Sequence, residues 1–291
     1  MIVLKRVGIA VTTIAKGALL AGLLLAGHAR AAQCPLVPVG VPLAEAFQVS
    51  QLIKGDKFSE ADEILEKLHQ KNLLTEGGDL LTMRQMFDLQ AVSPMNENLV
   101  RKWVDARPQS FFGQLNAGIF YSIKASDARG GEVASKTSKE QFKRMHEFNV
   151  IATGYLLKAM ELDASSAMPH HVILTVAAYD GQAAGKTAAQ WLQIAIQTDP
   201  KNLAARVDAT YFLTPRWGGS FELLDRMVQE SEKSLSAQNV HYLRYNVVLA
   251  KASHEKVIAE NNLKAHELYK EALSMCENSS KARDGIIRTS Q

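Results

Sequence analysis

The chain has 291 residues, of which 33 are lysine or arginine and 30 are aspartate or glutamate. Four of the basic residues and none of the acidic ones lie in the first 31 positions, so the rest of the chain has 29 basic and 30 acidic residues, a net charge of −1. This near-neutral balance excludes the strongly basic class of proteins that bind nucleic acid. We therefore expect no nucleic-acid partner.

The segment 1–31 is predicted to be a secretory signal peptide. Lys5 and Arg6 precede an apolar run at 17–26, and a small-x-small cleavage pattern ends at Ala31. The run is too short to be a permanent membrane span. We expect cleavage near Ala31, a periplasmic or secreted protein, and no stable membrane span after the signal is removed.

The two cysteines, Cys34 and Cys276, are predicted to form a disulfide, because an isolated pair in an exported protein is typically bridged. The bridge would join an extended N-terminal arm at 32–42 to a C-terminal helix. For so long a loop, the chain-entropy model gives roughly 5 kcal/mol at most. The alternatives are two unpaired thiols, a lipidated Cys34 or a catalytic thiol. Gln33 is not the small residue of a lipidation site, and the chain has no Cys-x-x-Cys.

From residue 43 the apolar residues recur at helical spacing, and no alternating run is long enough for a sheet. The fold class is therefore predicted to be all-α, with one domain at 43–288. The first predicted helices cover 43–54, 58–68, 80–87, 98–106 and 111–127. A longer helix follows a capping box between Ser138 and Gln141 and ends at Leu162 and Asp163.

An internal repeat indicates how these helices are arranged. The segment 155–163 resembles 191–200, and Ala159 and Ala195 lie 36 residues apart. This interval is close to the ~34 residues of tetratricopeptide repeats, and a further echo lies at 268–273. We expect antiparallel helix hairpins stacked as a tetratricopeptide-like solenoid, with a groove that binds protein.

The segment 214–220 joins two predicted helices and is the most distinctive stretch of the chain. Its residues are Thr214, Pro215, Arg216, Trp217, Gly218, Gly219 and Ser220. The residue before proline is disfavoured in a helix, the two glycines allow unusual backbone angles, and Ser220 is placed to cap the next helix. These turn requirements leave the roles of Arg216 and Trp217 unexplained. The two residues either form a structural corner or belong to a recognition surface, and the second interpretation is supported because both residue types are favoured binding anchors.

A second break carries charge beside glycines in the same way. It contains Asp127, Arg129, Gly130 and Gly131. We hypothesise that the two breaks meet in the fold, with Asp127 paired to Arg129 or Arg216 near Trp217. A structural corner and a ligand site are both open interpretations.

Other motifs do not support catalysis. The segment 181–187 lacks the first glycine of a phosphate-binding loop, so it is predicted to be a turn between helices. His170 and His171 are adjacent, and adjacent side chains on a helix point about 100° apart, so they are not placed to chelate one metal. His254-Glu255 lacks the second histidine of the zinc-protease pattern. We expect no metal, no cofactor and no catalytic residue.

Four short motifs occur in a characteristic order. They are Ala-Arg-Gly-Gly ending at Gly131, the Leu-Asp helix end at Asp163, Thr-Asp-Pro at 198–200 and Pro-Arg-Trp-Gly-Gly-Ser at 215–220. Over roughly 45–235 the chain resembles the bacterial domain of unknown function 4034. The resemblance implies a helical, repeat-like domain without an assigned reaction. Family members often have a tryptophan shortly before Ala-Arg-Gly, where this chain has residues 123–126.

These features predict an exported, non-catalytic helical-repeat protein. It would act as a protein-interaction, adaptor or immunity-type module in the bacterial periplasm, with another protein as partner. The alternative is a periplasmic enzyme with a site around Arg129, Arg216 and Trp217. Charged groups converging in a closed pocket favour the enzyme, and an open surface with scattered aromatic residues favours the binding module.

Overall fold

The structure is a computed structural model that describes residues 44–70, 86–90 and 95–290, all within one compact unit. In these ranges all regular secondary structure is helical, so the predicted all-α class is confirmed. The helices are α1 (Ala44–Lys54), α2 (Phe58–Gln70), α4 (Glu97–Ala106), α5 (Phe111–Arg129), α6 (Lys139–Leu162), α7 (Met168–Tyr179), α8 (Ala188–Thr198), α9 (Leu203–Phe212), α10 (Phe221–Ser231), α11 (Ala237–Val257), α12 (Asn262–Met275) and α13 (Ser280–Thr289). Short 3-10 helices cover Ala134–Lys136 and Pro215–Trp217, and residues 86–90 are also helical.

Several predictions fall outside the described residues. They concern the signal peptide at 1–31, the arm at 32–42, Cys34, and most of the helix predicted at 80–87. Cys276 is described and is fully buried at the end of α12. Among the described helices, none combines the length and the apolar character needed to cross a membrane.

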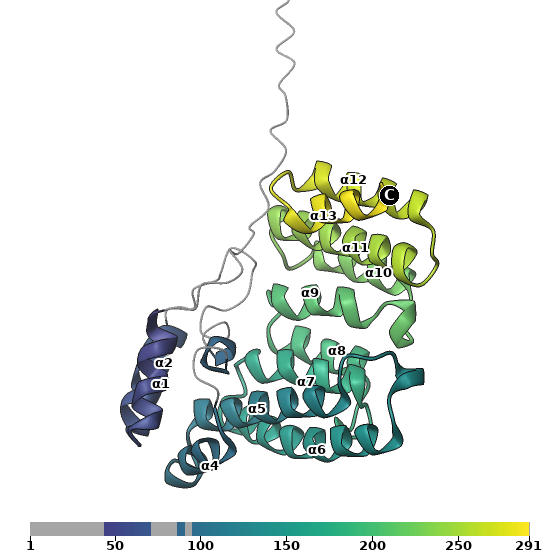
Figure 1. The fold of residues 1–291 in the computed structure, drawn as a ribbon. Coiled ribbons are helices and arrows are strands. Elements are labelled where there is room, and N and C mark those ends of the chain that lie inside the picture. Colours follow the sequence, from purple (N-terminus) through teal and green to yellow (C-terminus); the bar gives the residue numbers. More distant parts are fainter. Residues whose placement is uncertain (1–43, 71–85, 91–94, 291) are drawn as a thin grey trace, which may run out of the picture. The chain divides into compact units, whose positions relative to one another are not determined.

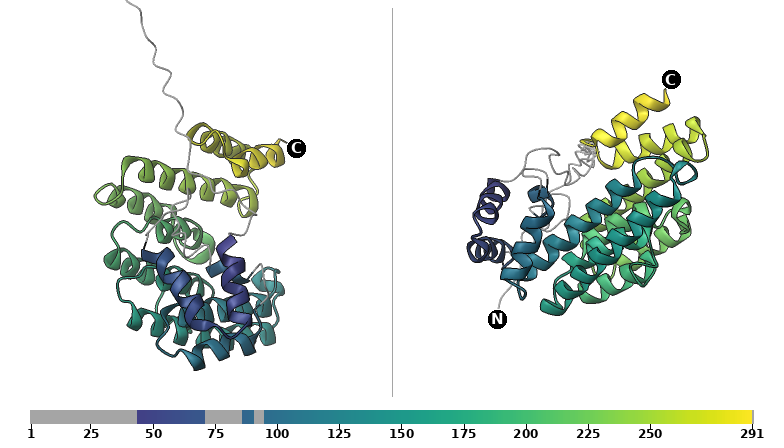
Figure 2. Two further views of the ribbon diagram at one scale, coloured as in Figure 1. Left: turned by 90° about the vertical axis from the view of Figure 1, so that its left-hand side faces the viewer. Right: turned by 60° about the horizontal axis from the view of Figure 1, so that its bottom comes forward.

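From α5 onward, each helix packs against the next one along the chain (Figure 1). In addition, α5 contacts α7, α7 contacts α9, α9 contacts α11, and α11 contacts α13. The succession can be followed from teal to yellow in both views of Figure 2. From α5 onward, each helix therefore packs against its sequence neighbours, and the odd-numbered helices also pack against one another two places along the chain.

The turns between helices repeat one hydrogen-bond pattern. At the ends of α6, α8 and α12, the backbone carbonyl of a fully buried alanine accepts a hydrogen bond from the backbone N–H of the residue four places later. The N···O distances are 3.0, 2.9 and 3.0 Å. These pairs are Ala159 with Asp163, Ala195 with Asp199, and Ala272 with Cys276. Three residues further on, the buried side chains of Ser166, Asn202 and Ser279 accept a backbone N–H at the start of the next helix. The 36-residue sequence repeat is thus matched by a repeated local geometry.

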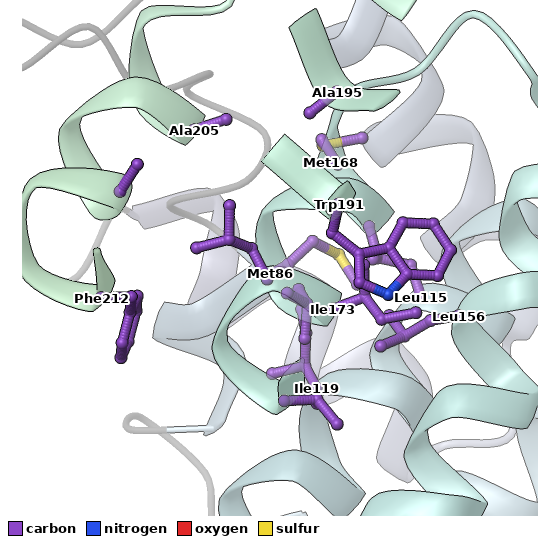
Figure 3. Close-up of a cluster of buried hydrophobic side chains, with 14 of the residues drawn as sticks. Met86, Leu115, Ile119, Leu156, Met168, Ile173, Trp191, Ala195, Ala205 and Phe212 are labelled. Atoms are coloured by element: carbon purple, nitrogen blue, oxygen red, sulfur yellow. The ribbon is translucent and has the colours of Figure 1, made fainter. Parts of the chain in front are cut away.

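The core is built where these helices meet (Figure 3). Leu115 and Ile119 of α5, Leu156 of α6 and Ile173 of α7 are fully buried. Trp191 of α8 is 4% exposed, and its indole Nε1 donates to the carbonyl of Ala184 at 3.1 Å. This bond satisfies the polar atom of a large buried side chain, so Trp191 contributes its apolar area without an unpaired donor.

The helix boundaries follow their capping residues. The capping box of Ser138 and Gln141 is present as predicted, and Thr187 forms a second one with Gln190 at the start of α8. The predicted turn at 181–187 is confirmed between α7 and α8. One boundary was predicted wrongly, because α5 continues to Arg129 instead of ending near residue 127. Only the glycine at position 130 stops it.

Candidate functional site

The segment 214–220 forms a tight corner between α9 and α10. Thr214 is extended, with ψ of 162°, and the next three residues form a 3-10 turn that ends at Gly218, where φ is +82°. A Cβ on Gly219 would lie 2.0 Å from the carbonyl oxygen of Leu213, so only glycine fits there. Ser220 then accepts the backbone N–H of Leu223 at 3.1 Å and caps α10, as predicted.

The other predicted segment is the last turn of α5 and the loop after it. The Nη1 atom of Arg129 donates to the carbonyls of Gly130 at 3.0 Å and Glu132 at 2.9 Å. The amide of Gln141 donates to the carbonyl of Arg129 at 2.9 Å. Gly130 is the C-cap of α5, whereas Gly131 has open space around it. Arg129 is therefore held in place by bonds to its own loop and to α6.

The two segments meet at Tyr179, the last residue of α7. The guanidinium of Arg129 lies over the Tyr179 ring, 5.8 Å from its centroid, and the Trp217 ring packs edge-on against the same ring at 5.0 Å. Arg216 lies over Trp217 at 5.4 Å, and Tyr211 packs against Trp217 at 6.0 Å. We call these five residues the arginine–aromatic corner.

The predicted pairing of Asp127 is wrong. Asp127 is exposed, and it forms no ion pair with Arg129 or Arg216, all three being described residues. The physical reason is the helix itself. Asp127 and Arg129 are two positions apart in the last turn of α5, so their side chains point about 200° apart around the axis.

The family model for the domain of unknown function DUF4034 matches residues 45–184 and 176–248 of this chain, a region that contains the whole corner. The chain belongs to the DUF4034 family. No curated protein and no solved structure matches the chain. The resemblance deduced from the two glycine-containing motifs is thus confirmed, and the match continues to residue 248, about as far as the middle of α11.

Two uncompensated positive charges distinguish the corner of this DUF4034 chain. Within the described ranges, neither Arg129 nor Arg216 has a carboxylate partner. Burial, reinforced by the nearby Tyr211, raises the pKa of Tyr179 above 10.0, and the charges of both arginines oppose that rise. Tyr211 is 49% exposed and Arg216 is exposed, so the corner is accessible from outside. It is suited to bind an anionic group beside an aromatic surface.

A histidine–aspartate pair lies next to the corner. The Nδ1 atom of His146 on α6 is 2.8 Å from Oδ2 of Asp180, the residue after Tyr179. The other oxygen of Asp180 accepts the backbone N–H of Ala183 at 3.0 Å. The bond to Asp180 orients the imidazole and leaves Nε2 available. In the described part of the chain, no serine or cysteine is in hydrogen-bond contact with His146.

Sequence reasoning missed Tyr179, Tyr211, His146 and Asp180. The two tyrosines lie at the ends of predicted apolar helices, where aromatic residues are normally part of the core. The position of Asp180 between a helix end and a glycine is a recognisable signal for a side chain that binds the following turn. Nothing in the sequence around His146 indicates its partner, because that partner is 34 residues away.

This chain also has a partly open cavity of about 230 Å³ that adjoins the corner. It is lined by residues of α5, α6, α7 and α9 and by Phe87. Two members of its wall, Arg129 and Tyr179, belong to the corner as well. No group of three histidine, cysteine, aspartate or glutamate side chains in the described ranges is placed to hold a metal ion.

Proposed function

We propose that this protein is an exported, non-catalytic helical-repeat protein that binds another protein in the bacterial periplasm, as an adaptor or immunity-type module. The observation that carries the proposal is the arginine–aromatic corner. It combines two arginines that have no carboxylate partner in the described part of the chain with an exposed tyrosine and a tryptophan. Arginine, tyrosine and tryptophan are the residues most often found as binding anchors.

The architecture supports the same role. Helices that contact partners one and two places away, with turns that repeat one hydrogen-bond pattern, are typical of stacked hairpins. We interpret them as a tetratricopeptide-like solenoid, whose repeats place successive helices along one extended surface. The predicted signal peptide and the predicted Cys34–Cys276 bridge both fit an oxidising, extracytoplasmic compartment.

The charge of the corner indicates the chemistry of the partner. An acidic side chain or a chain terminus could form a bidentate bond with either guanidinium, and the neighbouring rings would exclude water from that bond. We therefore expect the partner to offer one or more carboxylates beside apolar groups. Raising the ionic strength should slow its association, since opposite charges on two proteins steer their encounter.

Affinity capture from native periplasm tests this proposal. The mature chain with its disulfide intact is compared with Arg216→Ala/Trp217→Ala and with Arg144→Ala/Arg226→Ala, which removes charge at sites outside the corner. We expect one partner to be retained by the wild type and by the control variant, and lost by the folded corner variant. Retention by all three would contradict a role for the corner and move the search to the rest of the helical surface.

The His146–Asp180 pair is the observation that favours the alternative, an enzyme with its site around Arg129, Arg216 and Trp217. An oriented imidazole with a free Nε2 can act as a general base. If capture yields no partner, turnover of a library of small anionic substrates should be measured for the wild type and for His146→Ala. Activity that disappears in the variant would establish the enzyme and replace the binding proposal.

A further inference from the structure

The cavity behind the corner has the features of a binding site for a small molecule. Its wall is mostly apolar, with Phe87, Ile123, Val176 and Phe212 among the contributors. At about 230 Å³ it is below the 300–1,000 Å³ typical of drug-sized ligands. At about 30 Å³ for each water molecule of liquid, it corresponds to roughly eight waters. An amino-acid-sized molecule is the class that fits this space.

One polar side chain in the cavity wall has a buried donor without a hydrogen-bond partner. Asn149 of α6 is 3% exposed, and its Nδ2 group is buried without a hydrogen-bond acceptor among the described residues. A buried amide donor left without a partner is costly, and such groups in folded proteins call for an explanation. A ligand oxygen in the cavity would supply the missing acceptor.

A second polar group in the wall carries charge. Arg129 uses Nη1 for the carbonyls of its own loop, and in the described part of the chain its other N–H groups donate to no protein atom. The same guanidinium lies over the ring of Tyr179, which also lines the cavity. The cavity wall therefore combines apolar side chains with the guanidinium of Arg129, which has free N–H donors, and with the unpaired amide of Asn149.

We propose that this cavity binds an amino-acid-sized carboxylate with an apolar side chain. The carboxylate meets the free N–H groups of Arg129, Asn149 donates to an oxygen of the same ligand, and the apolar group fills the space between α5, α7 and α9. Such chemistry has two sources, a free small carboxylate or the C-terminal residue of a peptide. The site shares Arg129 and Tyr179 with the arginine–aromatic corner, and Asn149, which lies outside the corner, distinguishes ligand binding from the protein binding proposed above.

Calorimetric titration of the mature full chain at low ionic strength tests this site with four probes. They are 4-methylpentanoate, its uncharged amide 4-methylpentanamide, the peptide acetyl-Gly-Gly-Leu with a free carboxylate, and the same peptide as an amide. We expect one or both carboxylates to bind and both amides to fail. Tighter binding of the peptide carboxylate identifies a chain terminus as the source, and tighter binding of 4-methylpentanoate identifies a free molecule.

Three variants complete the experiment. Asn149→Leu and Arg129→Met should each weaken carboxylate binding roughly tenfold to a hundredfold, the effect of losing a hydrogen bond to a charged group. Arg144→Met changes the same charge on the exposed side of α6 and should leave the Kd unchanged. Asn149→Leu should also keep or raise the Tm, because it removes an unpaired donor. Equal binding of amides and carboxylates, no binding of any probe, or an unchanged Kd in the first two variants would overturn the proposal.

Discussion

At the scale of single residues, the corner depends on a close backbone contact that leaves no room for a side chain at position 219. Gly219 lies against the backbone of Leu213, and a Cβ at position 219 would approach the Leu213 carbonyl carbon to 2.4 Å. We expect Gly219→Ala to lower the free energy of unfolding by about 3 kcal/mol, because backbone has to move to relieve the overlap. Urea denaturation measures the change.

Gly131→Ala is the matched control for that substitution. Gly131 is the second glycine of the other predicted segment, and a Cβ there would meet no atom within 4 Å. Its free energy of unfolding should stay within about 0.5 kcal/mol of the wild type. Equal effects of the two substitutions would contradict the packing argument, since both replace a glycine by alanine.

We expect His170 to make the stability of the fold depend on pH. It is 4% exposed, and burial lowers its pKa below the ordinary 6.5, against a weaker opposing contribution from the carbonyl of Ser166. The unfolded chain therefore binds a proton at His170 more readily than the folded chain does. Folding is favoured above pH 6.5 and loses this contribution as pH falls from about 6.5 through the lowered pKa.

We expect His170→Gln to remove this dependence. The variant keeps a donor near Ser166 but has no group that titrates. Between pH 7 and pH 5, the free energy of unfolding of the wild type should fall relative to the variant, with a slope of at most about 1.4 kcal/mol per pH unit. Denaturation curves at four pH values provide the measurement, and curves that stay parallel would show that His170 is not responsible.

At the scale of elements, we expect the buried helix caps to contribute more to the free energy of unfolding than the exposed ones. Ser279 caps α13, is 1% exposed, and also shares a hydrogen bond of 2.5 Å with the hydroxyl of Tyr245. Ser279→Ala removes the cap and leaves a buried hydroxyl unpaired, so we expect a loss of about 3 kcal/mol. Ser236→Ala removes an exposed cap of α11 and should cost about 1 kcal/mol.

A double variant separates the two contributions of Ser279. In Ser279→Ala/Tyr245→Phe, the cap of the Ala282 N–H is still lost, but no Tyr245 hydroxyl is left buried without a partner. The double variant should therefore be more stable than the sum of the two single changes predicts, by about 1 kcal/mol. Additive effects would mean that the Tyr245 bond contributes nothing beyond the cap.

Capping chemistry is also why most helices could be predicted from the sequence. The helix predicted at 43–54 corresponds to α1, and the helix after Ser138 corresponds to α6, because polar caps and glycines lie close to the real ends. The end of α5 was placed too early, since Asp127 and Arg129 looked like part of the loop. Charged residues are common in the last turn of a helix, and only Gly130 has the backbone angle that ends it.

At the scale of the whole molecule, the sequence indicated that the two glycine-containing segments meet but not which residue joins them. The glycine motifs around Arg129 and Arg216 stand out because turns require particular residues. Tyr179, which lies between them, is separated from Arg129 by 50 positions and belongs to an ordinary apolar helix. Contacts of this kind depend on how the helices stack, and that arrangement has no local signature. The pairing of Asp127 was wrong for a local reason instead, because α5 continues through Arg129 and turns the two side chains apart.

The predicted disulfide is the last property of the whole chain to test. Cys276 is fully buried at the end of α12, in the position that Asp163 and Asp199 occupy in the other repeated turns. Substituting it would disturb that turn as well as any bridge.

Cys34→Ser is therefore the better variant, because it removes the bridge without changing α12. If the bridge exists, the oxidised wild type should be more stable than Cys34→Ser by up to roughly 5 kcal/mol. Adding a reductant to the wild type should abolish that difference, and mass spectrometry of the exported protein should find peptides containing residues 34 and 276 linked. Equal stability of Cys34→Ser and the oxidised wild type, with both thiols alkylated, would show that the two ends of the mature chain are not joined.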